Sequence, residues 1–298
     1  MKIVEVGPRD GLQNEPGLVP VAAKVSLIEA LVDAGLRHVE CGSFVSAKWV
    51  PQMADTSAVF AKVRRVPGVS YSALVPNLMG LAEAIRCGVS EVAVFAAASE
   101  TFSRRNINCS IDESLDRLGA VANEAKSHGM RVRGYVSCVL GCPYEGEIAL
   151  AAVARVAGAL AGMGCYEISL GDTIGVGTPR KAQDMVRAVT RTVPIKQLAV
   201  HFHDTWGQAL ANILATLETG IEAVDASVAG LGGCPYAKGA SGNVATEDVV
   251  YMLDGLGVDT GVNLEKLAVA GRDIMQLLGR TTTSKAAAAL AALKENLV

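Results

Sequence analysis

Two histidines stand close together at the end of an apolar segment. From Leu198 the chain runs Leu-Ala-Val-His-Phe-His, which places His201 and His203 two residues apart. Successive side chains of a β-strand point to opposite faces, so both imidazoles share one face if this segment is a strand. Two such imidazoles provide half of a metal site; the alternative is a histidine pair bonded to backbone carbonyls. The choice depends on whether other strands supply oxygen ligands.

The composition excludes several classes of partner. The 298 residues are 50% hydrophobic and 19% charged, which is typical of a well-buried globular protein. A net charge of −3 gives no electrostatic attraction to nucleic acid or to an anionic membrane surface. The most apolar helical segment, residues 148–163, contains Arg155 and is too short to span a bilayer. We therefore expect neither nucleic acid nor a membrane as a partner.

The cysteines predict a reducing compartment. The seven cysteines form no C-x-x-C pair and no even framework, and a strand pattern begins directly after Met1. Reduced thiols without a signal peptide are expected of a cytoplasmic protein.

The chain repeats one pattern of a short apolar strand followed by an amphipathic helix. Each unit is roughly thirty residues long, and eight units predict a (β/α)8 TIM barrel of the α/β class. A doubly wound open sheet is the alternative, but no G-x-G-x-x-G turn follows the first strand. The expected strands are residues 3–6, 37–44, 69–75, 91–96, 130–139, 165–170, 195–202 and 221–228.

The C-terminal part of the chain predicts two further helices, at residues 264–278 and 284–297. We expect them to pack on the barrel or on a neighbouring subunit. Since no linker or low-complexity segment interrupts the chain, we expect one catalytic domain over residues 1–298, with the C-terminal helices beginning near residue 260.

Polar residues follow several of the expected strands, where barrel enzymes place their active sites. Arg9 and Asp10 follow the first strand, Glu40 lies near the end of the second, and Asp172 follows the sixth. Asp10 is a hard oxygen ligand that could join the two imidazoles, although by itself it also suits a turn or helix cap. Mixed nitrogen and oxygen donors favour Mg²⁺ or Mn²⁺, while two histidines and one carboxylate also describe a non-haem iron oxygenase.

The segment after the eighth strand is rich in glycine. Residues 230–243 contain five glycines in fourteen positions and include Cys234. Such a backbone can move or approach a ligand closely. We therefore expect Cys234 to face substrate, whereas Cys138 and Cys142 lack the four closed ligands of a zinc site and are interpreted as structural.

With these residues placed, the sequence resembles the 3-hydroxy-3-methylglutaryl-CoA lyase family, within the metal-dependent barrel lyases and Claisen-type synthases. The resemblance runs from Val6 to about Asp254 and rests on specific motifs. They are GPRDGLQNE at 7–15, SFVSAKWVPQM at 43–53, GDTIG at 171–175, HFHD at 201–204 and GLGGCP at 230–235.

The resemblance implies a metal-assisted retro-Claisen cleavage of an acyl-CoA substrate to acetyl-CoA and acetoacetate. It implies that a divalent metal, Mg²⁺ or Mn²⁺, is bound by Asp10, His201, His203 and Asn243. It implies catalytic roles for Arg9, Asp172 and Cys234, with support from Glu40. In this reading a ligand histidine or Asp172 accepts the hydroxyl proton, Arg9 stabilises the enolate oxygen, and Cys234 protonates the carbanion.

Three alternatives remain beside the lyase that the motifs favour. They are a lyase for a substrate with a longer branch, a synthase that condenses acetyl-CoA with a 2-oxo acid, and a non-catalytic binding barrel. The animal enzymes of the family carry a mitochondrial leader and a peroxisomal C-terminal tripeptide, whereas this chain has no leader and ends in Asn296-Leu297-Val298. We therefore expect a bacterial-type cytoplasmic enzyme, forming a homodimer or a higher homo-oligomer.

Overall fold

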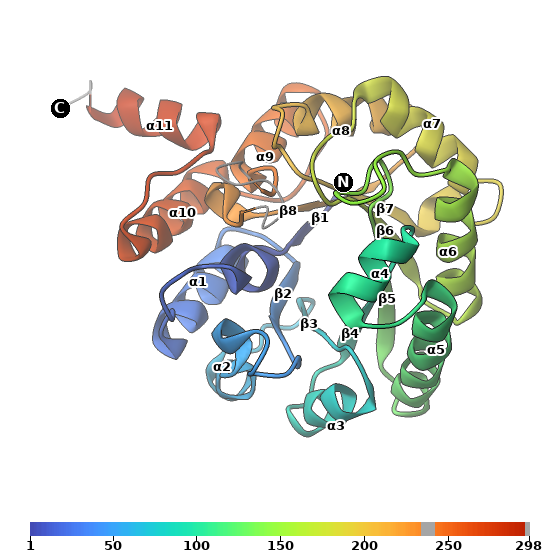
Figure 1. Ribbon diagram of the computed structural model, residues 1–298. Coiled ribbons are helices and arrows are strands. Elements are labelled where there is room, and N and C mark those ends of the chain that lie inside the picture. Colours follow the sequence, from blue (N-terminus) through green and yellow to red (C-terminus); the bar gives the residue numbers. More distant parts are fainter. Residues whose placement is uncertain (234–241, 296–298) are drawn as a thin grey trace.

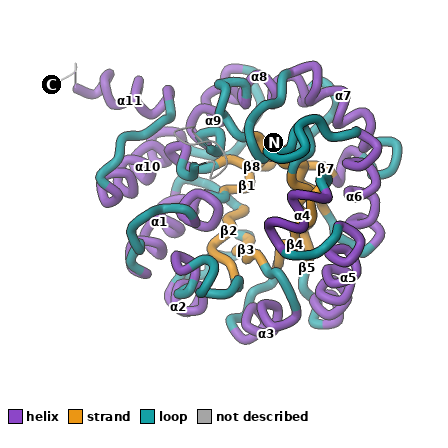
Figure 2. The backbone as a smooth tube through the Cα atoms, in the orientation of Figure 1, coloured by secondary structure: helices purple, strands orange, loops and turns teal. Residues whose placement is uncertain are grey.

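Eight parallel strands form a closed barrel in which the strand order follows the chain and β1 pairs with β8. The computed structural model describes residues 1–233 and 242–295. Figures 1 and 2 show the strands at the centre with the helices around them. This architecture confirms the TIM-barrel prediction. The strands are β1 (Lys2–Glu5), β2 (His38–Ser43), β3 (Ser70–Leu74), β4 (Glu91–Ala97), β5 (Arg131–Ser137), β6 (Glu167–Asp172), β7 (Leu198–Phe202) and β8 (Ala223–Ala226).

The helices cover the outside of the barrel, and most lie where the apolar periodicity places them. They are α1 (Val21–Asp33), α2 (Thr56–Lys62), α3 (Leu78–Arg86), α4 (Glu100–Ile107), α5 (Ile111–Ser127), α6 (Leu150–Gly162), α7 (Pro179–Val189), α8 (Ala209–Leu217), α9 (Thr246–Gly255), α10 (Leu264–Leu278) and α11 (Lys285–Glu295). Short helical turns are η1 (Gly7–Gly11), η2 (Pro51–Met53), η3 (Ile195–Gln197) and η4 (Val228–Gly230).

Local chemistry explains where several helices begin. Asn77 caps α3 by accepting a hydrogen bond from the backbone N–H of Gly80. Ser110 and Glu113 form a reciprocal capping box at the start of α5. Asn263 caps α10, which ends at Gly279 in the left-handed conformation.

One helix was missed, and several strand boundaries differ from the sequence-based expectation. Helix α4 was not predicted; only Phe102 and Ser103 of its eight residues are buried, so it has almost no apolar stripe. The seventh strand begins at Leu198 rather than residue 195, since a 3₁₀ turn precedes it. The eighth strand ends at Ala226, and the chain then turns through η4, where Ala229 has a φ of 57°.

The C-terminal helices extend the ring of helices on one side. Helix α10 contacts α1 and η4, and α11 contacts α9 and α10. Figure 1 shows α11 outside the ring that surrounds the barrel. These contacts support our proposal that the chain forms one domain. Over the described residues, no helix combines the length and apolar character that a membrane crossing requires.

Candidate active site

A single π-helical turn, η1, follows β1 and carries two of the predicted site residues, Arg9 and Asp10. Single π-helical turns are often found at functional sites. The turn lies tightly against the strand: the Oε1 atom of Glu5 accepts a hydrogen bond of 2.8 Å from the backbone N–H of Gly7. A Cβ atom on Gly7 would lie 2.6 Å from that same oxygen, so a larger residue would displace the turn and with it both side chains.

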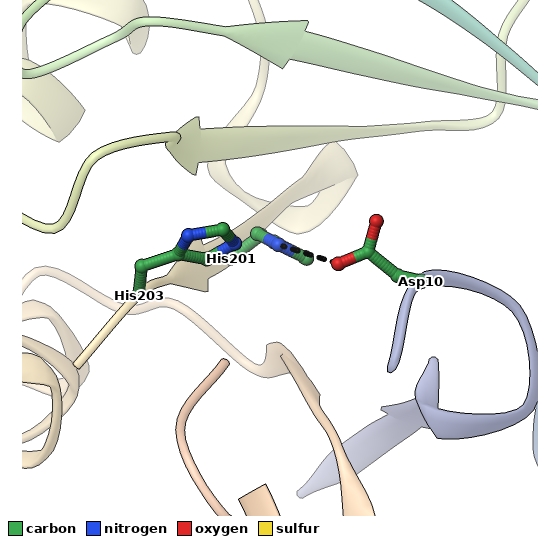
Figure 3. A group of neighbouring side chains, drawn as sticks. All are labelled: Asp10, His201 and His203. Atoms are coloured by element: carbon green, nitrogen blue, oxygen red, sulfur yellow. Dashed lines mark ion pairs between the residues drawn. The ribbon is translucent and has the colours of Figure 1, made fainter. Parts of the chain in front are cut away.

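Asp10, His201 and His203 lie together at the carboxyl end of the barrel (Figure 3). Each offers a ligand atom, and these atoms all lie within 4.8 Å of one another. The Nε2 atom of His201 is 4.0 Å from Oδ2 of Asp10, and the two imidazole centroids are 5.3 Å apart. The two histidines therefore do share one side of their segment, as the strand pattern predicted.

Asn243 joins this group through the backbone as well as through its side chain. It forms an isolated antiparallel bridge with His203, which follows directly after β7. Its Nδ2 atom donates hydrogen bonds to Oδ2 of Asp10 at 2.9 Å and to the carbonyl of Leu231 at 3.2 Å. The structure thus brings together all four residues that the resemblance implied as metal ligands.

The protonation states of these groups suit a divalent cation. Burial, and then the neighbouring charge of His201, lower the pKa of His203 to about 4, so its imidazole is neutral at neutral pH. Its Nδ1 atom is buried and has no hydrogen-bond partner within the described part of the chain. Burial acts to raise the pKa of Asp10, but Arg9 and the two histidines outweigh it and hold that pKa at about 2. A neutral imidazole with an unpartnered nitrogen and an ionised carboxylate fit a metal ion.

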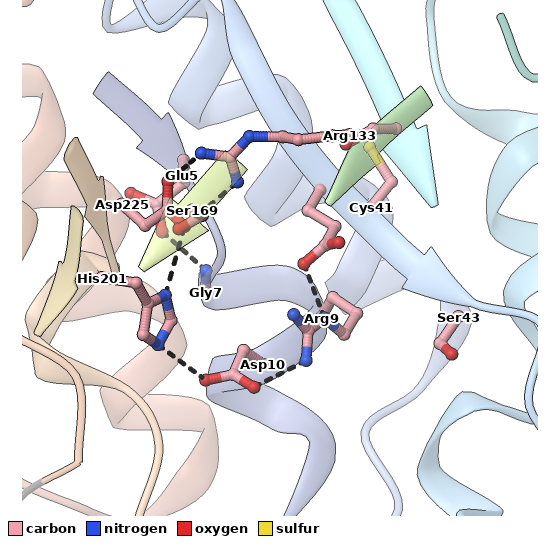
Figure 4. A network of polar contacts seen from close by, with 12 residues as sticks. Glu5, Gly7, Arg9, Asp10, Cys41, Ser43, Arg133, Ser169, His201 and Asp225 are labelled. Atoms are coloured by element: carbon pink, nitrogen blue, oxygen red, sulfur yellow. Dashed lines mark hydrogen bonds and ion pairs between the residues drawn. The ribbon is translucent and has the colours of Figure 1, made fainter. Parts of the chain in front are cut away.

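Arg9 links Asp10, beside which it lies in Figure 4, to Glu40. Its Nε atom donates to Oε2 of Glu40 and its Nη1 atom to Oδ1 of Asp10, both at 2.6 Å. Burial opposes the charge of the guanidinium, but Glu40 and Asp10 outweigh burial and raise the pKa of Arg9. The result is a permanent positive charge, held in one orientation beside the candidate metal site.

Asp172 has its own hydrogen-bond partners at the end of β6. Asp172 is the last residue of β6, and its buried carboxylate accepts backbone hydrogen bonds from Val176 at 3.3 Å and Gly177 at 2.7 Å. Burial raises its pKa above the ordinary value. It therefore holds the loop after β6, and a catalytic role remains a proposal. Cys234 lies outside the described residues.

Cys138 and Cys142 lie in a small buried cluster with Ala97 and Phe102. Among the residues that the structure describes, Asp10, His201 and His203 form the one group with metal-ligand geometry. The interpretation of Cys138 and Cys142 as structural residues stays a prediction, which their burial supports.

The sequence reasoning missed Asp225 on β8, which lies 3.3 Å from Nδ1 of His201. Asp225 also accepts hydrogen bonds from Arg133 and Ser169. Burial acts to raise the pKa of Asp225, but Arg133 and His201 outweigh it and lower that pKa. A charged residue within an apolar strand segment, as at Arg133 and Asp225, is the signal that could have identified them.

A family model described as HMGL-like matches residues 1–274. The chain belongs to this family. It is 60% identical to the mitochondrial hydroxymethylglutaryl-CoA lyase of Rattus norvegicus over 289 residues, which cover 97% of this chain and 89% of the rat protein. It is 59% identical to the 3-hydroxy-3-isohexenylglutaryl-CoA/hydroxy-methylglutaryl-CoA lyase of Pseudomonas aeruginosa, over 98% of this chain and 97% of that protein.

A crystal structure of a family member shows the same fold. The hydroxymethylglutaryl-CoA lyase from Pseudomonas aeruginosa superposes with a TM-score of 0.96 at 59% identity, covering 98% of this chain and 97% of that chain. The family assignment and the barrel fold therefore rest on nearly the whole chain.

Proposed function

We propose that this protein is a divalent-metal-dependent hydroxymethylglutaryl-CoA lyase, which cleaves 3-hydroxy-3-methylglutaryl-CoA to acetyl-CoA and acetoacetate. The observation that carries the proposal is the cluster of Asp10, His201 and His203. The guanidinium of Arg9 donates a hydrogen bond of 2.6 Å to the carboxylate of Asp10 in this cluster. The activity printed for the family members of about 60% identity supports it.

Asp10, His201, His203 and Asn243 are the residues that would hold the metal, and their nitrogen and oxygen donors suit Mg²⁺ or Mn²⁺. When bound, such an ion polarises the hydroxyl and carboxylate oxygens of the substrate and makes the hydroxyl more acidic. The two oxygen donors and the lack of a cysteine in this set argue against a structural zinc site, which is built mainly from cysteine and histidine.

Arg9 supplies the fixed positive charge that the cleavage step requires. When the bond between C2 and C3 of the substrate breaks, its electron pair passes to the thioester, and negative charge develops on the thioester oxygen. A guanidinium already held by Glu40 stabilises this charge without reorganising. Glu40 thus acts through Arg9, as a positioning residue.

Two proton transfers complete the reaction. Asp172 or a ligand histidine accepts the proton of the substrate hydroxyl as C3 becomes the ketone of acetoacetate. Burial raises the pKa of Asp172, which makes its carboxylate a stronger base. We assign the proton that reaches C2 of the enolate to the thiol of Cys234, on the basis of its glycine-rich segment and the family resemblance.

The test measures acetyl-CoA release by purified protein after chelation with EDTA, and again after Mg²⁺ or Mn²⁺ is added back. Activity should vanish on chelation and return with either ion. Full activity in exhaustively chelated protein would refute the metal-centred mechanism. Metal-dependent condensation of acetyl-CoA with a 2-oxo acid, without cleavage, would instead identify a synthase.

A wider substrate range is the second candidate. The Pseudomonas aeruginosa relative is named for both an isohexenyl-branched and a methyl-branched substrate. We propose to compare kcat/KM for the two branches. A preference for the longer branch would change the assigned substrate but not the reaction.

Self-association and location are separate proposals. Exposed apolar side chains on α10 and α11, including Leu277 and Leu293, support a homodimer or a higher homo-oligomer, which light scattering would test. The six cysteines among the described residues are free, which supports a reducing compartment such as the cytoplasm.

A further inference from the structure

The interior of the barrel contains a charged network beneath the candidate metal site. Arg133 on β5 donates hydrogen bonds from Nη1 and Nη2 to the two carboxylate oxygens of Asp225 on β8, at 3.1 Å and 2.7 Å. Strand β5 pairs only with β4 and β6, so this contact crosses the inside of the barrel. Both side chains are almost fully buried.

Asp225 is held by more donors than a simple ion pair requires. Its Oδ2 atom accepts a hydrogen bond of 2.7 Å from the hydroxyl of Ser169, as well as the bond from Arg133, and lies 3.3 Å from Nδ1 of His201. A carboxylate fixed from this many sides cannot rotate. The direction in which it accepts a hydrogen bond from Nδ1 of His201 is therefore fixed too (Figure 4).

Arg133 is fixed in turn from its other side. Its Nε atom donates to Glu167 at 2.7 Å, and Glu167 pairs with Lys2 at 2.9 Å. The guanidinium also lies 5.0 Å from the ring centre of Tyr135, which contacts His201 edge to face. Arg133 thus joins the lower part of the barrel to the layer that holds His201.

Stability alone does not account for such a network. Buried ion pairs contribute little net stability, because desolvation offsets their attraction, and apolar residues of similar volume often serve as well. The network does, however, end on one of the two candidate ligand histidines. No carboxylate among the described residues bonds Nδ1 of His203, so only His201 has this kind of partner.

We propose that Asp225 and Arg133 are positioning residues for the metal site: Arg133 fixes Asp225, and Asp225 holds Nδ1–H of His201 so that Nε2 faces Asp10. A carboxylate that accepts the second N–H of a ligand histidine sets its tautomer and ring orientation and makes it a stronger ligand. This inference rests on the proposed function, because it requires the metal site.

The first test measures Mn²⁺ affinity by electron paramagnetic resonance of the free ion. Asp225→Asn keeps the shape of the side chain and should weaken binding about 10- to 100-fold, the usual cost of losing such a partner. Glu91→Gln is the matched control. Glu91 is also a buried carboxylate, but it bonds Ser70 and Tyr166 at the opposite end of the barrel, so binding should not change.

The second test asks whether Arg133 acts through Asp225. Arg133→Met should weaken Mn²⁺ binding in the wild-type background, but much less when added to Asp225→Asn, because the two act in series. Equal losses in both backgrounds would show that Arg133 acts independently of Asp225. Ser169→Ala, a milder change that removes one bond to Asp225, should give a smaller loss and covers the case in which a charge variant does not fold.

The third test observes His201 directly. The chain has four histidines, so ¹⁵N-histidine labelling gives few signals. With Mg²⁺ added, wild-type protein should show an Nδ1 proton far downfield, as expected for a bond to a carboxylate, and Asp225→Asn should lose it while Glu91→Gln keeps it. Unchanged Mn²⁺ affinity and an unchanged signal in Asp225→Asn would overturn the positioning role. If instead His203→Ala binds Mn²⁺ like wild type, the metal site itself is wrong.

Discussion

Removing the charge of Arg9 should affect catalysis and stability for different reasons. In Arg9→Gln the thioester oxygen loses a fixed cationic donor, which should lower kcat by ~10²–10³, or about 2.7–4 kcal/mol. KM should change little, since this charge develops chiefly in the transition state. A normal kcat with a raised KM would show that Arg9 only binds substrate.

The effect on stability follows from the burial of its partner. The side chain of Glu40 is 1% exposed and bonds Arg9 at 2.6 Å, so the variant leaves a buried carboxylate without its cation. Breaking a buried pair in this way costs about 3–5 kcal/mol. Losing the ion pair between Arg9 and Asp10 adds less to this loss of stability, because the side chain of Asp10 is 25% exposed and solvent screens its charge.

A double variant separates the two effects. Arg9→Gln/Glu40→Gln removes the uncompensated charge and should regain most of the lost stability, as measured by urea unfolding in EDTA. Its turnover, measured as acetyl-CoA release at saturating substrate, should stay as low as in Arg9→Gln. If the double variant regained both stability and turnover, Arg9 would be a structural residue. Its proposed role in stabilising the enolate oxygen would then be refuted.

Three further predictions follow from other residues. His203→Ala should lower Mn²⁺ affinity and turnover together, and normal metal affinity in this variant would exclude His203 as a ligand. Burial raises the pKa of Glu247 from 4.5 to about 8, so the folded protein keeps a proton that the unfolded chain loses. This contribution to stability is complete below pH 4.5 and is lost as the pH rises through about 8, and Glu247→Gln should flatten that decline in urea unfolding. Cys234→Ser should keep its fold and bound metal but lose most of its lyase activity, whereas Cys165→Ser should lose stability at most; wild-type turnover in Cys234→Ser would remove that thiol from the mechanism.

Much of the fold could be predicted from the sequence, because periodicity is a local property. The alternation of apolar strands and amphipathic helices identified the barrel, and the spacing of His201 and His203 placed both imidazoles on one side. Helix α4 escaped detection because only two of its eight residues are buried, which leaves almost no apolar stripe to recognise. The motifs indicated the family, and the resemblance to that family implied the candidate ligands, including Asn243, which lies outside the motifs.

Only the tertiary structure decided which distant side chains meet. The π-helical turn after β1 sets the direction of Asp10, and the bridge between His203 and Asn243 closes the group across forty residues of chain. Neither has a periodic signature.

The charged network of Arg133 and Asp225 shows most clearly that sequence periodicity does not reveal contacts between distant residues. Arg133 and Asp225 belong to strands that are not neighbours and are separated by 92 positions in the chain, so no local pattern relates them. They meet because barrel closure turns both side chains into one interior, where a charge without a partner would be too costly to bury. The sequence determined which residues could do chemistry; closure of the barrel determined which of them hold one another in place.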